Sequence, residues 1–182
     1  MQKYFRAIAH RLKVGFSTIP SFSNWFYTVV LLLIYAAISL PVGFLSDWLQ
    51  FQIISGGWIK ITGVVIRAFF VPGISEELIF RVLLLPHPTE NISSNIKWLW
   101  GSIGLSIFII YHPLQTITTF PAAFATFNHP VFLLLAAFLG IACTIAYWRS
   151  GSVWTAILIH WIIVSVWLVF LGGYDKLFSL SV

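Results

Sequence analysis

Long apolar stretches separated by short polar segments run along most of the chain. Four of them are each long enough to form a helix that crosses a hydrocarbon core about 30 Å thick, and they occupy residues 24–46, 97–117, 131–148 and 153–172. A further stretch, residues 58–85, contains Pro72 and Gly73, which predict either one kinked span or a half-helix followed by a new helix with Ser75 as its cap. The pattern therefore predicts an all-α polytopic membrane bundle with about five spanning segments.

Polar and turn-forming residues mark the connections between these stretches. Residues 86–94 read as a polar loop, residues 149–152 as a tight turn, and residues 118–130 as a turn-rich aromatic loop that lies along the interface or re-enters the membrane. Residues 1–23 are basic and mildly amphipathic, so they are predicted to lie on the membrane surface. Residues 24–175 are then predicted to form a single transmembrane helical domain.

The basic residues predict the orientation of this domain. If five segments cross the membrane, most of the lysines and arginines at the ends of the predicted spans or outside them fall on one side, namely Lys3, Arg6, Arg11, Lys13, Lys97 and Arg149. Lys176 falls on the other side. Because cytoplasmic loops carry an excess of Lys and Arg, the N-terminus is predicted to be cytoplasmic, in a bacterial-type inner membrane or a thylakoid.

The composition excludes several classes of protein. Hydrophobic residues make up 59% of the chain and charged residues only 8%, whereas a soluble domain carries roughly 25% charged residues. The net charge of +5 is small, and no basic stripe with exposed aromatic residues predicts nucleic-acid binding. Cys143 is the only cysteine, so no intrachain disulfide or thiolate metal cluster can form, and we interpret it as a small buried apolar residue.

Three charged residues lie inside the apolar stretch 58–85. Each ionisable group in a bilayer costs roughly 2.5–3.5 kcal/mol on insertion scales, so these groups should face the protein interior and find partners. Glu77 and Arg81 are four residues apart, which predicts an ion pair on one helix face. Glu76 lies about 140° from Arg81 around the helix axis. It therefore has no partner on its own helix and should face polar groups from other segments.

Two histidines in other predicted spans are candidates for those groups. Counted from the cytoplasmic ends, Glu76, His112 and His160 all fall in the central part of the hydrocarbon core. We therefore expect one carboxylate and two imidazoles from three helices to meet at one buried, partly wet site. His10 and His87 are predicted outside the membrane and His129 in a loop, so they do not belong to this group.

Such a group has a definite chemistry. A buried carboxylate can take a proton from water, and an imidazole can hold that water or stabilise an oxyanion. Neither Ser75 nor Cys143 has an adjacent histidine or lysine arranged to activate it as a nucleophile, which disfavours covalent catalysis. No cofactor is predicted. A metal held by two histidines and a carboxylate remains an alternative, as do purely structural roles for the histidines and for the pair of Glu77 with Arg81.

The order of these motifs resembles the CPBP family of intramembrane proteases, which contains CAAX prenyl endopeptidases and bacteriocin-processing or self-immunity (Abi-type) proteins. The family pattern is EExxxR, then FxxxH, then HxxxN, and the resemblance covers about residues 68–172. The matching positions are Glu76, Glu77 and Arg81 in "EELIFR", Phe108 and His112 in "FIIYH", and His160.

The resemblance implies an all-helical fold with the active site inside the bilayer and a peptide or membrane protein as the substrate. It implies that Glu76 and His112 activate water for peptide hydrolysis and that His160 stabilises the oxyanion, with Glu77, Arg81 and Phe108 in support. This chain departs from the pattern at Val164, where the family commonly has asparagine.

The departure leaves other functions open. Valine cannot donate a hydrogen bond, so the chain is either a protease with a substitute donor or a non-proteolytic immunity, scaffold or assembly protein, alone or in a larger membrane complex. A proton-coupled carrier is a third hypothesis, which the lack of internal repeats disfavours. Pro113, directly after His112, is predicted to bend or end its helix near the site.

Overall fold

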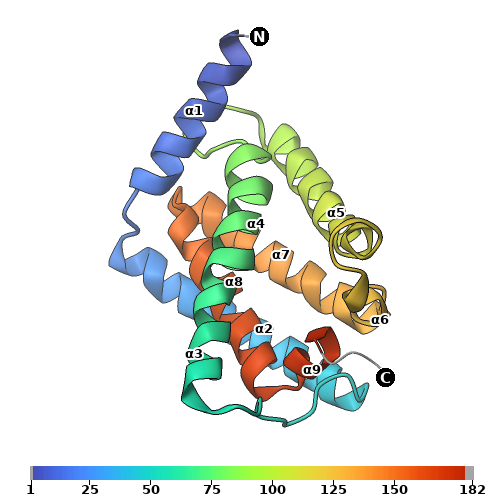
Figure 1. Ribbon diagram of the computed structural model, residues 1–182. Helices are drawn as coiled ribbons and strands as arrows, with labels where there is room; N and C mark the ends of the chain where they lie inside the picture. Colours follow the sequence, from blue (N-terminus) through green and yellow to red (C-terminus); the bar gives the residue numbers. More distant parts are fainter. Residues whose placement is uncertain (1, 179–182) are drawn as a thin grey trace.

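The computed structural model describes residues 2–178 as a bundle of helices joined by short connections (Figure 1). The helices are α1 (Gln2–Ser17), α2 (Phe22–Leu45), α3 (Gly57–Ala68), η1 (Phe69–Ile74), α4 (Ser75–Glu77), η2 (Leu78–Leu83), α5 (Ser94–Thr118), η3 (Pro121–Ala123), α6 (Phe124–Phe127), α7 (Pro130–Ser150), α8 (Val153–Phe170) and α9 (Gly173–Phe178). Within residues 2–178 the only sheet-type pairing is a single bridge between Gln52 and Leu171. The all-α fold predicted from the sequence is confirmed.

Three helices are long and apolar enough to cross a membrane: α2, α7 and α8. They lie within a few residues of three predicted spans. The predicted span 97–117 corresponds to α5, which is also long, but α5 carries too many polar residues to meet the same criterion of length and composition. The chain is an integral membrane protein, and α5 and the broken α3–η2 segment complete its helical domain.

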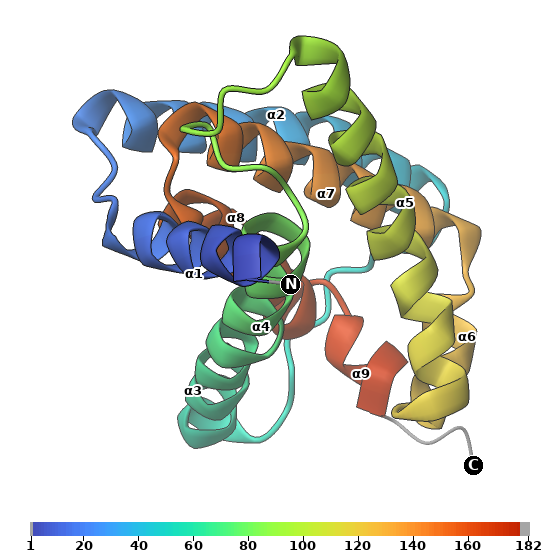
Figure 2. The same cartoon turned by 90° about the horizontal axis from the view of Figure 1, so that it is seen from above.

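The helix α7 lies at the centre of the bundle. It packs against α8, α2 and α5 (Figures 1 and 2). The turn between α7 and α8 is tight, as predicted, because Gly151 adopts a left-handed conformation with φ +66° and Ser152 caps α8 by accepting a hydrogen bond from the Trp154 backbone N–H. This hairpin contributes most of the largest buried apolar cluster, which includes Leu139 and Ile157.

The segment after α3 is broken where the sequence predicted. Val71 leaves the helical conformation, with φ −131° and ψ 84°, immediately before Pro72. A side chain at Gly73 would lie 3.0 Å from the carbonyl oxygen of Ala68, so the kink needs a glycine there. The expected cap at Ser75 is wrong, because the chain is already helical at that residue and its side chain makes no capping hydrogen bond.

The first helix packs against the body of the protein. Arg11 binds Glu90 through two hydrogen bonds of 2.5 and 2.7 Å, and Trp154 donates its indole N–H to the carbonyl of Phe16 at 2.9 Å. These contacts attach α1 to the loop before α5 and to α8. The division into a surface segment of residues 1–23 and a domain of residues 24–175 stays a prediction.

The helix α5 also departs from expectation. It continues through Pro113 to Thr118 and does not end near the site. Proline supplies no backbone donor, so the carbonyl of Ile109 lacks its helical hydrogen bond from residue 113. The segment after it, predicted as a loop over residues 118–130, contains the short helices η3 and α6.

Candidate active site

Glu76 and Glu77 lie on α4, the short α-helical turn between the two π-helical segments η1 and η2. Both residues are buried: Glu76 is 8% exposed and Glu77 is 0% exposed. They are buried because α4 packs against α8 and against both π segments. The kink at Val71 precedes both carboxylates and the π-helical segment η2 follows them, and π turns are frequent at functional sites.

Arg81 forms the ion pair with Glu77 that their spacing predicted. Its Nε atom lies 3.1 Å from Glu77 Oε2, although the two groups are not aligned as a hydrogen bond. The guanidinium also donates from Nη2 to the carbonyl of Gly140 on α7 at 3.0 Å, and it lies 5.1 Å from the ring centroid of Phe108 on α5. A buried cation needs such partners. Arg81 therefore connects η2 to α5 and α7.

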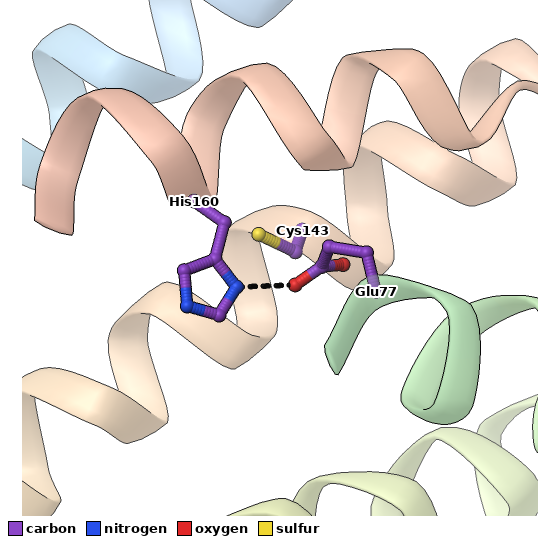
Figure 3. A group of neighbouring side chains, drawn as sticks. All are labelled: Glu77, Cys143 and His160. Carbon is purple, nitrogen blue, oxygen red and sulfur yellow. Dashed lines mark hydrogen bonds and ion pairs between the residues drawn. The ribbon is translucent and has the colours of Figure 1, made fainter. Parts of the chain in front are cut away.

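His160, on α8, contacts both glutamates. Its Nδ1 atom lies 2.6 Å from Glu77 Oε1 (Figure 3), and its Nε2 atom lies 3.8 Å from Glu76 Oε2. Because the other oxygen of Glu77 faces Arg81, the Glu77 carboxylate acts as the acceptor and Nδ1 carries the proton. The interpretation of Glu77 as a partner of Arg81 alone was therefore incomplete, since it also fixes the orientation of the His160 ring.

His112, on α5, is oriented by its own helix and by aromatic neighbours. Its Nδ1 atom donates to the carbonyl of Phe108 at 2.9 Å. A carbonyl only accepts, so Nδ1 carries the proton and Nε2 of the neutral ring is an acceptor. The rings of Phe108, Phe127 and Phe132 surround the imidazole at centroid distances of 5.0, 5.3 and 5.2 Å. The ring therefore presents an acceptor in a fixed direction.

A cavity of about 980 Å³ is lined by Glu76, His112 and His160 together. It lies at the upper end of the size range of small-molecule sites, and most of its other lining residues are apolar. Glu76 Oε2 is buried and has no hydrogen-bond partner among the described residues. The structure thus brings the three groups predicted from the sequence to one cavity, with Glu77 behind His160 and outside the lining.

A second cluster has the spacing of a metal site. The ligand atoms of Glu77, Cys143 and His160 lie within 4.8 Å of one another (Figure 3), and no other group within residues 2–178 meets this criterion. However, Glu77 and His160 are in direct hydrogen-bond contact, and Arg81 faces the second carboxylate oxygen. A metal ion would have to break the first contact and sit beside a buried cation. These residues, as arranged, do not fit a metal ion.

Two features of the site were missed in the sequence. The Gly140 carbonyl that binds Arg81 comes from a main-chain group, which carries no sequence signal. Gln115 lines the same cavity as His112, and its Nε2 atom is buried without a hydrogen-bond partner among the described residues. Gln115 follows His112 by three residues on one helix, and residues with this spacing share a helix face. This spacing was the sequence signal that could have identified Gln115.

The fold and the site define a class of protein: an all-helical integral membrane protein in which a buried glutamate–histidine cluster opens into a cavity between the helices. The family model described as Type II CAAX prenyl endopeptidase Rce1-like matches residues 58–166, which include Glu76, Glu77, His112 and His160. The chain belongs to this family, in agreement with the resemblance of its motifs to CPBP proteases. No curated protein and no solved structure matched the chain in the corresponding comparisons.

Proposed function

We propose that the chain is an intramembrane endopeptidase that hydrolyses peptide bonds with a water molecule activated by Glu76 and His112. The observation that supports this proposal most directly is the carboxylate of Glu76, which lacks a hydrogen-bond partner among the described residues and lines one cavity with two imidazoles. Buried carboxylates held only for structure are usually paired, as Glu77 is. Glu76 is therefore the candidate general base.

The charges of the cluster suggest where the protons reside. The opposite charges of Glu77 and Arg81 compensate each other. Nδ1 of His160 carries a proton and donates it in a hydrogen bond to Glu77. One further proton shared between Glu76 and Nε2 of His160 makes the buried cluster neutral, which low dielectric favours. When that proton lies on His160, Glu76 is a free carboxylate and His160 is a charged donor.

The hydrolysis then follows in two steps. Glu76 takes a proton from the attacking water, while the acceptor Nε2 of His112 holds the second hydrogen of that water. The water oxygen bonds to the carbonyl carbon, and the electron pair of the C=O bond moves to oxygen, where the Nε2–H of His160 stabilises it. As the oxyanion collapses, the C–N bond breaks and Glu76 returns its proton to the leaving amine. No covalent enzyme intermediate and no metal ion is needed.

The cavity also suggests what kind of substrate binds. Its lining is mainly apolar, but Lys60 and Arg67 contribute positive charge from α3. Arg67 and Glu76 line the same cavity from opposite sides of the kink at Val71, and three extended residues span roughly 10 Å. We propose that Arg67 binds the terminal carboxylate of a peptide whose apolar C-terminal end enters the cavity, as the family's name suggests for CAAX peptides.

Cleavage of a defined peptide by the purified protein tests the proposal. The probe is an internally quenched fluorescent peptide that ends in a prenylated CAAX sequence, presented in detergent or liposomes. Glu76→Gln and His112→Ala should each abolish cleavage, while Glu90→Gln, which changes a carboxyl outside the cavity, should leave it intact. Cleavage at wild-type rates by both cavity variants would refute the proposed mechanism.

A second function has one observation in its favour. Val164, where the family commonly carries asparagine, lines the cavity and offers no donor there. A chain that has lost proteolysis would act as a membrane binding or assembly protein instead. In that case the wild-type protein would not cleave the probe, and cells carrying Glu76→Gln would keep the wild-type phenotype and the same co-purifying membrane partners.

A further inference from the structure

The proposed hydrolysis leaves the oxyanion with too few donors. Oxyanions in enzymes are commonly held by two or more preorganised hydrogen-bond donors. In this cavity the Nε2 atom of His112 is an acceptor, because Nδ1 donates to the Phe108 carbonyl. Glu76 is an acceptor as the base. Of Glu76, His112 and His160, only protonated His160 can donate, through its Nε2–H. Val164, one turn further along α8, contributes no hydrogen-bonding side chain.

Gln115 carries the missing kind of group. Its side chain lines the cavity, and its Nε2 atom is shielded from solvent but has no hydrogen-bond partner within residues 2–178. A buried amide donor without a partner is destabilising, because it has lost its hydrogen bonds to water. The unpaired amide of Gln115, on the same helix as His112, is explained if a bound ligand accepts its hydrogen bond.

Gln115 and Val164 both line the cavity, and each follows a histidine of the site on its own helix. Gln115 follows His112 by three residues on α5, and Val164 follows His160 by four residues on α8. The two regions are also linked by contacts. Val164 packs in one apolar cluster with Phe120 and Phe127. The backbone N–H of Phe120 donates to the Gln115 carbonyl at 2.7 Å, and the Phe127 ring contacts the His112 ring.

We propose that the side-chain amide of Gln115 is the second oxyanion donor of this protein, acting from α5 in place of a donor at position 164 on α8. This inference rests on the proposed proteolytic function. Gln115 is then a catalytic residue in the strict sense, because its Nε2–H contacts the carbonyl oxygen as negative charge develops on it.

Two substitutions of Gln115 test this role with the same quenched prenylated peptide. Gln115→Leu removes the donor, and Gln115→Glu keeps the shape but replaces the amide by a carboxyl group that repels an oxyanion when ionised. Loss of one oxyanion donor typically lowers kcat by roughly 10²- to 10³-fold. Both variants should show this loss in kcat with KM changed less than about threefold. Thr118→Val, which alters a residue of the same helix outside the cavity lining, should retain wild-type kinetics.

A second-site substitution separates a donor role from a structural one. Val164→Asn places an amide on α8, so the double variant Gln115→Leu/Val164→Asn should cleave at least tenfold faster than Gln115→Leu alone. A transition-state analogue with a tetrahedral phosphinate in place of the scissile amide should lose affinity for Gln115→Leu in proportion to kcat. If the role of Gln115 were purely structural, Val164→Asn would not restore cleavage and the affinity for the analogue would not fall in proportion to kcat.

The outcomes distinguish this inference from the function on which it rests. A wild-type kcat in Gln115→Leu, together with loss of cleavage in Glu76→Gln, would overturn the role of Gln115 and leave the proposed hydrolysis standing. A fall in kcat that Val164→Asn does not reverse would overturn the placement of the oxyanion between α5 and α8. Absence of cleavage by the wild-type protein would overturn both.

Discussion

Substitution by the isosteric glutamine should change the stability of the fold by very different amounts at the two adjacent glutamates. Glu77 is paired with Arg81 and His160, whereas Glu76 Oε2 has no hydrogen-bond partner among the described residues. Replacing Glu77 with glutamine should therefore destabilise the fold. Replacing Glu76 with glutamine should change stability much less, because its Oε2 atom makes no hydrogen bond and lies 3.8 Å from its nearest charged partner, His160 Nε2.

The size of the effect follows from what remains around Arg81 in Glu77→Gln. Arg81 is 2% exposed and would keep only the Gly140 carbonyl and the face of Phe108 as partners. Breaking a buried pair by removing one partner costs about 3–5 kcal/mol. In a chain of this size each kcal/mol lowers Tm by about 2–4 °C, so the expected fall in Tm is about 6–20 °C.

Thermal unfolding of the purified variants in one detergent measures this difference. The double variant Glu77→Gln/Arg81→Met removes the unpaired cation and should recover most of the lost Tm, because a buried ion pair is often replaceable by apolar side chains. A Tm of Glu77→Gln within 2 °C of wild type, or a larger loss in Glu76→Gln than in Glu77→Gln, would show that the roles assigned to the two carboxylates are wrong.

Three further predictions concern other parts of the molecule. Burial raises the pKa of Glu90, but the hydrogen bonds from Arg11 and from a backbone N–H outweigh it and hold that pKa below its usual value. The packing of α1 against the rest of the protein should therefore be retained above pH ~4.3 and weaken as the pH falls through the lowered pKa of Glu90. Hydrogen exchange of the α1 backbone amides measures this change. The variant Glu90→Gln should weaken the packing of α1 at every pH. Gly140→Val should lower the free energy of unfolding by about 1–3 kcal/mol through overpacking, because even a Cβ atom at this position would lie 2.8 Å from the Leu105 side chain. A Tm equal to that of the wild type would contradict the close contact of α5 with α7. Arg67→Ala should raise KM about tenfold for a probe with a free C-terminal carboxylate and leave KM unchanged for the C-terminal amide; equal effects on both probes would exclude carboxylate binding.

The fold was largely predictable because its signals are local. Apolar length located α2, α7 and α8 within a few residues, since a helix that crosses a bilayer must satisfy a length set by the membrane. The kink at Val71 followed from Pro72 and Gly73. The continuation of α5 through Pro113 was not predictable in the same way, because tertiary packing outweighs the loss of one backbone hydrogen bond.

The sequence predicted which residues of the site come together, but not how their helices are rotated. Counting residues placed Glu76, His112 and His160 at a similar level, and all three line one cavity. Which carboxylate His160 would contact depends on how α8 is turned about its axis and on the π segments flanking α4, and neither is encoded in residue spacing. The closer contact is therefore with Glu77, and the resemblance of motifs could not reveal this preference.

The contacts of Arg81 bear on how the molecule is assembled during synthesis. Glu77 and Arg81 belong to one short stretch, but their partners come from α5, α7 and α8, which emerge later from the ribosome. Until the C-terminal hairpin inserts, the two charges can only neutralise each other, and His160 is absent. Glu77 and Arg81 therefore precede, in chain order, all the partners on α5, α7 and α8 that complete their contacts.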